Sequence, residues 1–131
     1  MQISAKIESR FHSQETTVQT EDIPNSLSIP VKPSGYGSAI NGEELLMLAL
    51  ATCFSNDIYR EAAKRKIAVS SVKVECTAEF GGEGEPARHI RYSARVSADA
   101  SPDVIDELIR ATDQVAEVHN TLRKGIPITL E

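Results

Sequence analysis

The chain has 131 residues, of which 40% are hydrophobic and 25% charged, which is typical of one globular domain spanning residues 1–131. Its formal net charge of −5 argues against nucleic acid or an anionic membrane as the main partner, because both bind basic surfaces. The start lacks the apolar region of a secretory signal, and the apolar run 45–54 is too short to span a bilayer. With only two cysteines, we expect reduced thiols and a cytoplasmic location.

The N-terminal residues predict three short strands. Residues 2–8 alternate apolar and polar side chains with period two, which indicates a half-buried strand. Residues 15–22 and 27–31 are interpreted as two more, the last being an edge or irregular strand because it contains Pro30. The Gly-, Pro- and Ser-rich segment 32–42 is then a loop, and it lacks the ending of a phosphate-binding loop.

Residues 41–66 predict one long helix. Asn41 is a good N-cap, and Glu44 completes a variant of the capping box. The first half of the helix is apolar on every side, so it must be buried on every side. A chain of this length covers such a helix poorly, and we therefore expect a homodimer whose interface includes residues 45–54. The alternative is a helix buried entirely within its own monomer.

The rest of the chain predicts a hairpin, a helix and a strand. Residues 71–80 and 88–98 alternate on either side of a glycine-rich turn, as in an antiparallel hairpin with one wet face. Ser101 and Pro102 are the start signals of an amphipathic helix that reaches about residue 122. Residues 126–130 are read as a short closing strand. This order of elements is an α+β fold.

The two cysteines have different surroundings in sequence. Cys76 occupies an inward position of a strand, where a cysteine usually serves as a small hydrophobe. Cys53 lies where the apolar half of its helix meets the charged half, with Asp57 one turn further on. A reactive thiol needs a helix N-terminus or a nearby cation, which this helix does not supply near Cys53. Composition alone leaves both a reactive and a packing role open.

The segment "NGEELLMLALATCF" resembles the signature of the OsmC/Ohr family, the osmotically induced proteins and organic hydroperoxide reductases. Asn41, Glu43, Cys53 and Phe54 keep the family spacing, with Gly42 in place of the usual proline. The basic segment and hairpin that follow, and "VAEVHNTLRKGIPITLE" at the end, also match in order. The resemblance implies an intertwined homodimer with two active sites at its interface.

The same resemblance implies roles for individual residues. Cys53 would attack a peroxide, an N-terminal arginine matched by Arg10 would activate it, and Glu43 would pair with that arginine. Glu43 and Cys53 are ten residues apart, about 15 Å along a helix, so a shared site needs them from different chains. The expected substrate pocket is apolar and includes Leu46, Met47, Leu50, Phe54, Ala116 and His119.

One feature departs from the family pattern. Its second, resolving cysteine falls at Ala116, followed by Glu117 where proline is usual. Without it, a sulfenic acid at Cys53 has no intramolecular partner there, so turnover needs an external thiol. His119 is either a surface histidine or a neighbour of this site. The three histidines show no metal-ligand spacing, and we expect neither metal nor cofactor.

Three functions remain open from the sequence. The first is a thiol peroxidase that reduces organic hydroperoxides through Cys53 in defence against oxidative stress. The second is a non-catalytic dimer that binds a small apolar ligand in the same interface pocket. The third is a stress-related scaffold in which Cys53 only packs.

Overall fold

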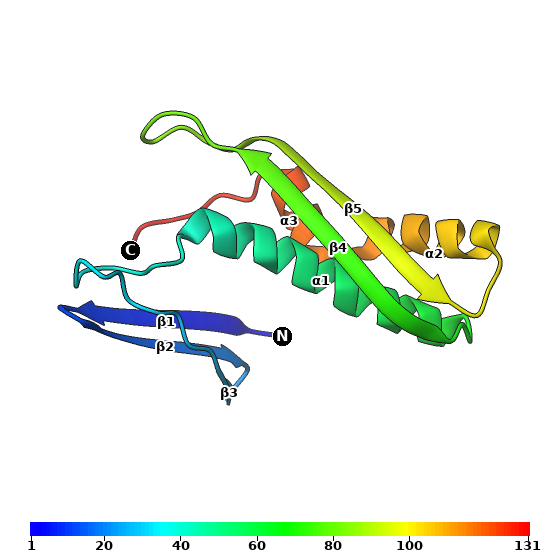
Figure 1. Cartoon of the computed structure of the whole chain (residues 1–131), viewed down its shortest axis with the longest axis horizontal. Coiled ribbons are helices and arrows are strands. Elements are labelled where there is room, and N and C mark those ends of the chain that lie inside the picture. The colour runs from blue at the N-terminus through cyan, green and yellow to red at the C-terminus, as the bar shows by residue number, and fades with distance from the viewer. The chain divides into compact units, whose positions relative to one another are not determined.

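The computed structural model describes residues 1–131 as two compact units, Met1–Leu45 and Leu46–Glu131. Three helices and antiparallel strands make up the chain (Figure 1), which confirms the α+β class. The expectation of a single domain stays a prediction. No helix combines the length and the apolar character that crossing a membrane requires.

The N-terminal unit is built on a three-stranded antiparallel sheet in the order β1-β2-β3. The strands are β1 (Ile3–Arg10), β2 (Ser13–Thr20) and β3 (Ile23–Ser26). The predicted third strand is misplaced: the pairing of β2 ends at Ser26, so residues 27–30 lie outside the sheet. Val31 makes only an isolated bridge with Ser38.

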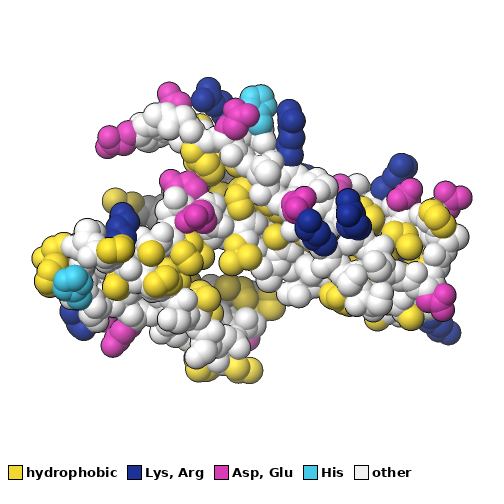
Figure 2. Space-filling model, viewed as in Figure 1, with side chains coloured by type: hydrophobic (Ala, Val, Ile, Leu, Met, Phe, Trp, Pro, Cys, Tyr) yellow, Lys and Arg dark blue, Asp and Glu magenta, His cyan; other side chains and the backbone are white.

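One face of strand β1 carries exposed hydrophobic side chains. Ile3 is 60% exposed and Ile7 is 53% exposed. Figure 2 shows hydrophobic side chains gathered at the surface of this unit, in the lower left of the view. Strand β1 is also an edge strand, paired only with β2. A row of unpaired backbone groups beside apolar side chains is a template for pairing with another chain.

Helix α1 runs from Gly42 to Lys64 and begins as predicted. The backbone N–H of Glu44 donates to Oδ1 of Asn41 at 2.8 Å, and the N–H of Asn41 donates to Oε2 of Glu44 at 2.8 Å. These reciprocal bonds are the capping box, and they satisfy two donors that the first turn otherwise leaves free.

The C-terminal unit contains a long antiparallel hairpin that crosses α1 (Figure 1). It consists of β4 (Val69–Glu79) and β5 (Arg88–Ala98). The predicted alternation is present, with Val72, Val74 and Cys76 half-buried between exposed neighbours. Phe80 and Ile90 are 41% and 42% exposed, because this end of the hairpin extends past the core.

The predicted second helix is broken in two. Helix α2 spans Pro102–Val115 and helix α3 spans Glu117–Lys124, separated by Ala116 in an extended conformation (φ −71°, ψ 105°). Ser101 caps α2 as expected, and Gly125 ends α3 with φ at 60°, a left-handed conformation that glycine adopts without strain.

The predicted closing strand is absent. Residues 126–131 have no regular secondary structure, and Ile128 and Leu130 are 100% and 97% exposed. A strand needs a partner ladder for its backbone groups, and β4 and β5 of the same unit pair only with each other.

The core lies where α1, the hairpin and α2 meet. Phe54, Ile58 and Leu108 have no exposed surface, and they pack with Ala62, Val96 and Ala116. Within one chain the first half of α1 is only partly buried, so the alternative of a helix buried entirely within its own monomer is wrong. Leu48 is 59% exposed and residues 45–47 are half-buried, because the hairpin and α2 cover the other half of α1.

Candidate functional site

Cys53 is half-buried on α1 and has two polar neighbours at its sulfur. Its thiol donates a hydrogen bond to Oδ2 of Asp57, 3.4 Å away and one helical turn further on. The backbone N–H of Val118 also interacts with the sulfur, and it lowers the pKa of the thiol. Cys53 therefore faces a carboxylate on its own helix and the first turn of α3.

The first turn of α3 is the local feature that the sequence did not reveal. Ala116 is extended and has no side-chain oxygen, so no side chain caps the free N–H groups of the turn that begins at Glu117. Such N–H groups and the helix dipole favour negative charge, which is what a cysteine thiolate carries. The break at Ala116 therefore places a thiolate-stabilising group beside Cys53.

Two carboxylates disfavour the thiolate form of Cys53. The ligand atoms of Cys53, Asp57 and Glu117 lie within 4.8 Å of one another. Burial, above all, raises the pKa of the Cys53 thiol, and the hydrogen bond to Asp57 and the charges of Asp57 and Glu117 raise it further. The Val118 N–H lowers the same pKa, but it does not reverse the outcome. The resting form is the thiol.

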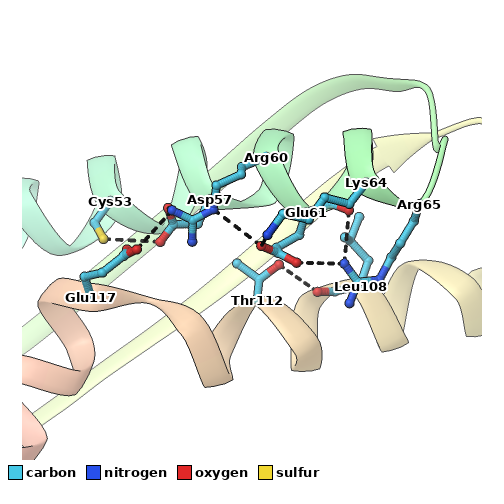
Figure 3. A network of polar contacts seen from close by, with 9 residues as sticks. All are labelled: Cys53, Asp57, Arg60, Glu61, Lys64, Arg65, Leu108, Thr112 and Glu117. Carbon is cyan, nitrogen blue, oxygen red and sulfur yellow. Dashed lines mark hydrogen bonds and ion pairs between the residues drawn. The ribbon is translucent and has the colours of Figure 1, made fainter.

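Arg60 joins the two carboxylates (Figure 3). Its Nη1 lies 3.1 Å from Oδ1 of Asp57 and 3.0 Å from Oε1 of Glu117. The cluster thus has its own cation, and it is a salt-bridged cluster rather than an open set of metal ligands. The sequence indicated no cation near Cys53 on this helix, and Arg60 reaches the cluster through its ion pair with Asp57.

The polar contacts continue along α1 to Glu61 (Figure 3). Its buried carboxylate lies 2.7 Å from Nζ of Lys64 and 2.9 Å from Nη1 of Arg65, and these hydrogen bonds lower its pKa to about 2. These ion pairs stabilise the C-terminal half of α1.

The predicted pocket residues separate into three groups. Phe54 and Ala116 have no exposed surface and belong to the core, so they line no open pocket. Leu46 and Met47 are half-buried. Leu50 and His119 line a cavity of about 230 Å³, together with Ile90, Tyr92, Leu122 and Arg123.

His119 is buried, so the interpretation of it as a surface histidine is wrong. It is 4% exposed and packs edge-on against Tyr92, with ring centroids 4.6 Å apart. Tyr92 and Arg123 were not singled out in the sequence. The alternation of β5 already placed Tyr92 inward, whereas nothing marked Arg123.

Arg10 and Glu43 belong to the N-terminal unit. Arg10 pairs there with Glu8, and Glu43 is exposed in the first turn of α1. Their roles at Cys53 stay predictions.

The family model described as OsmC-like protein matches residues 35–131 of this chain. The chain belongs to the OsmC-like protein family. The match contains α1, the hairpin, α2 and α3, and so includes Cys53 and all the residues of its cluster. No curated protein matches the chain.

Solved structures of OsmC/Ohr proteins have the same fold. An OsmC-like protein from Mycoplasma pneumoniae has a TM-score of 0.64 at 18% identity, over 93% of this chain and 86% of that one. The organic hydroperoxide resistance protein OsmC from Legionella pneumophila has a TM-score of 0.58 at 20% identity, over 94% and 90%. The organic hydroperoxide resistance protein OhrB of Bacillus subtilis has a TM-score of 0.57 at 18% identity, over 98% and 96%.

Proposed function

We propose that this OsmC-like protein is a thiol-dependent peroxidase that reduces organic hydroperoxides through Cys53. The observation that carries the proposal is the pair of contacts at the sulfur: an acceptor for the thiol proton, Asp57, and a donor for the thiolate, the Val118 N–H. The names of the Legionella and Bacillus relatives support the choice of substrate.

The first step uses both contacts. Asp57 takes the thiol proton, and the thiolate attacks one oxygen of the hydroperoxide. An S–O bond forms and the O–O bond breaks, so the sulfur is oxidised by two electrons to a sulfenic acid. The leaving alkoxide takes up a proton, which Asp57 can return, and departs as an alcohol. Arg60 keeps Asp57 paired while the proton moves.

The second step needs an external thiol. The chain has two cysteines, and position 116 is an alanine. One molecule of an external thiol condenses with the Cys53 sulfenic acid and releases water, which leaves a mixed disulfide. A second molecule then releases Cys53 as a thiol. Thiol reductants of this kind are abundant in the cytoplasm, where we expect the protein to act without a cofactor.

The working form is proposed to be a homodimer. The apolar first half of α1, with Leu48 exposed, and the open edge of β1 are two surfaces that a second copy would cover. Within one chain, Glu43 and Cys53 are about 15 Å apart along α1. Arg10 and Glu43 are therefore assigned to the active site of the partner chain.

The test is peroxide consumption by the purified protein. Cumene hydroperoxide and a dithiol are added, and loss of peroxide is compared between the parent protein, Cys53→Ser and the matched control Cys76→Ser. We expect turnover in the parent and in Cys76→Ser, and background loss in Cys53→Ser. Background loss of peroxide in all three proteins would contradict the proposed peroxidase activity.

A non-catalytic ligand-binding dimer is the second candidate. The raised pKa of Cys53 favours it, because a thiol reacts far more slowly than a thiolate. Mass spectrometry after one equivalent of hydroperoxide separates the two candidates. The peroxidase gains one oxygen atom at Cys53, whereas a protein that only binds ligands stays unmodified.

A further inference from the structure

The cavity between α1, β5 and α3 has a mainly hydrophobic lining. Leu50, Ile90, Leu122 and the ring of Tyr92 form most of its wall, and its volume is about 230 Å³. Typical pockets for drug-sized ligands have volumes of roughly 300–1,000 Å³, so this one suits a smaller molecule. Cys53 is not one of its lining residues.

His119 lines this cavity and has two unpaired polar atoms at its edge. The side chain is only 4% exposed, and Nδ1 and Nε2 are both buried without a hydrogen-bond partner. Its ring is held between aromatic neighbours, 4.6 Å from Tyr92 and 5.5 Å from Phe54 between centroids. A buried polar group left unpaired is destabilising, so a hydrogen-bonding partner that enters the cavity relieves this cost.

The other polar groups of the cavity are already paired. The Tyr92 hydroxyl donates to Asp113. Arg123 places Nη2 2.5 Å from Oδ1 of Asp113, and its Nη1 donates to the Asp113 carbonyl at 3.1 Å. The positive charge of Arg123 is thus offset by Asp113, and the cavity has no surplus charge to attract an anion.

The protonation state of His119 defines the ligand it can pair with. Burial, and then the charge of Arg123, lower its pKa, against smaller opposing effects of Asp113 and Asp57. The ring is therefore neutral at neutral pH and offers one N–H donor and one nitrogen acceptor. A hydroxyl group can serve either nitrogen, because it both donates and accepts. A carboxylate only accepts, and it would lose its hydration without meeting a free cation.

We propose that this cavity is a binding site for a small, neutral, apolar molecule with one hydroxyl group, an alcohol or a phenol, whose O–H pairs with His119. The hydrophobic wall takes the hydrocarbon part of the ligand. Leu50 supplies the floor from α1, and Ile90 and Leu122 contact the ligand from β5 and α3. The site stands apart from the chemistry of Cys53 and does not require it.

The test measures the affinity of the full chain for three matched probes by NMR titration. The probes are p-cresol, p-xylene, in which a methyl replaces the hydroxyl, and 4-methylbenzoate, which is an anion. We expect p-cresol to bind about two- to tenfold more tightly than p-xylene, the gain that one net hydrogen bond supplies, and 4-methylbenzoate to bind most weakly. Equal affinity for p-cresol and p-xylene, or tighter binding of the anion, would overturn the proposal.

Two variants of His119 identify the hydrogen bond. His119→Phe keeps the aromatic packing and removes both nitrogens, so the preference for p-cresol over p-xylene should disappear while p-xylene still binds. His119→Gln keeps a donor and an acceptor and should retain part of the preference. If His119→Phe keeps the full preference, the assignment of His119 is wrong.

Two control variants isolate the site. His89→Gln changes an exposed histidine of β5 and should leave all three affinities unchanged. Cys53→Ser should bind p-cresol like the parent, even where it abolishes peroxide turnover. Failure of the peroxidase proposal and failure of this one are therefore seen in separate measurements.

Discussion

The Cys53 thiol donates to Oδ2 of Asp57 across 3.4 Å, and this contact adds to the effect of burial in raising the pKa of the thiol. Asp57 is 5% exposed, so its charge acts on the thiol with little screening by water. A thiol bonded to a buried carboxylate resists ionisation, yet the same carboxylate is placed to accept its proton.

Asp57→Asn should make Cys53 more acidic. The substitution removes the negative charge of Asp57, which raises the pKa of Cys53, and replaces one carboxylate oxygen with an amide NH₂ group that can donate to a thiolate. Alkylation by iodoacetamide requires the thiolate, so its pH profile should shift to lower pH. The rate is followed by mass spectrometry in a Cys76→Ser background. Asp106→Asn, on the exposed face of α2, is the control, and an identical profile in Asp57→Asn would contradict this role of Asp57.

Glu61→Gln should weaken the fold at neutral pH and matter less in acid. In the folded protein Lys64, Arg65 and Arg60 hold the pKa of Glu61 at about 2, below its ordinary value of 4.5. Because folding lowers the pKa of Glu61, its ionised carboxylate stabilises the folded state at pH values above about 4.5. This stabilisation is lost as the pH falls from about 4.5 to about 2. Melting temperatures are compared at neutral pH and near both ends of this window.

The matched control for Glu61 is Glu107→Gln. Glu107 is exposed on α2, so its substitution should change the melting temperature little at any pH. A difference between Glu61→Gln and the parent that stays constant down to the acid end of the window would show that these ion pairs do not stabilise the fold.

Leu108→Ala should lower the free energy of unfolding by about 2–5 kcal/mol. Leu108 has no exposed surface and packs in the core with Phe54 and Ile58, so the loss of three carbon atoms leaves a cavity. Urea denaturation measures the change. Val104→Ala, at a position on the same helix that is 39% exposed, should cost about 0.5 kcal/mol or less. Equal decreases in the free energy of unfolding for the two variants would contradict the assignment of Leu108 to the core.

Leu48→Glu should dissociate the proposed homodimer. Leu48 is 59% exposed on the apolar half of α1, and a carboxylate in a desolvated interface costs several kcal/mol. Light scattering should give twice the mass of one chain for the parent protein and the mass of one chain for the variant. Tyr59→Glu, at a position that is 46% exposed on the charged half of α1, should remain dimeric. A parent protein with the mass of one chain contradicts the dimer.

The sequence predicted what local rules determine. The capping box at Asn41 and Glu44, the Ser101 cap and the alternation of β4 and β5 depend on neighbouring residues, and all were correct. The break at Ala116 was missed because alanine is the best helix former, and tertiary packing of a fully buried Ala116 overrides that propensity. The closing strand was predicted from an apolar run, although a strand also needs a partner.

The candidate site was only partly predictable for the same reason. Cys53 was found from its spacing in a family signature, but its surroundings come from a distant segment. Glu117 and Val118 reach the sulfur only because α3 begins where it does. Asp57 belongs to the charged half of the helix, yet it is only 5% exposed, and its ion pair with Arg60 compensates the burial of its charge.

Ala116→Cys should restore an intramolecular route for the sulfenic acid. Position 116 lies two residues before Val118, whose N–H contacts the Cys53 sulfur. After one equivalent of cumene hydroperoxide, the new thiol should condense with the Cys53 sulfenic acid, forming a disulfide and releasing water. Mass spectrometry should show the loss of two hydrogens, in place of the gain of one oxygen in the parent protein.

The control for this variant is Ala111→Cys, which adds a thiol to the middle of α2 instead. It should gain oxygen at Cys53 and form no disulfide. Because Ala116 is fully buried, the added sulfur should lower the free energy of unfolding by about 1–3 kcal/mol, and thermal melting shows whether the variant is folded. A folded Ala116→Cys protein that forms sulfenic acid but no disulfide would mean that α3 holds position 116 out of reach of Cys53.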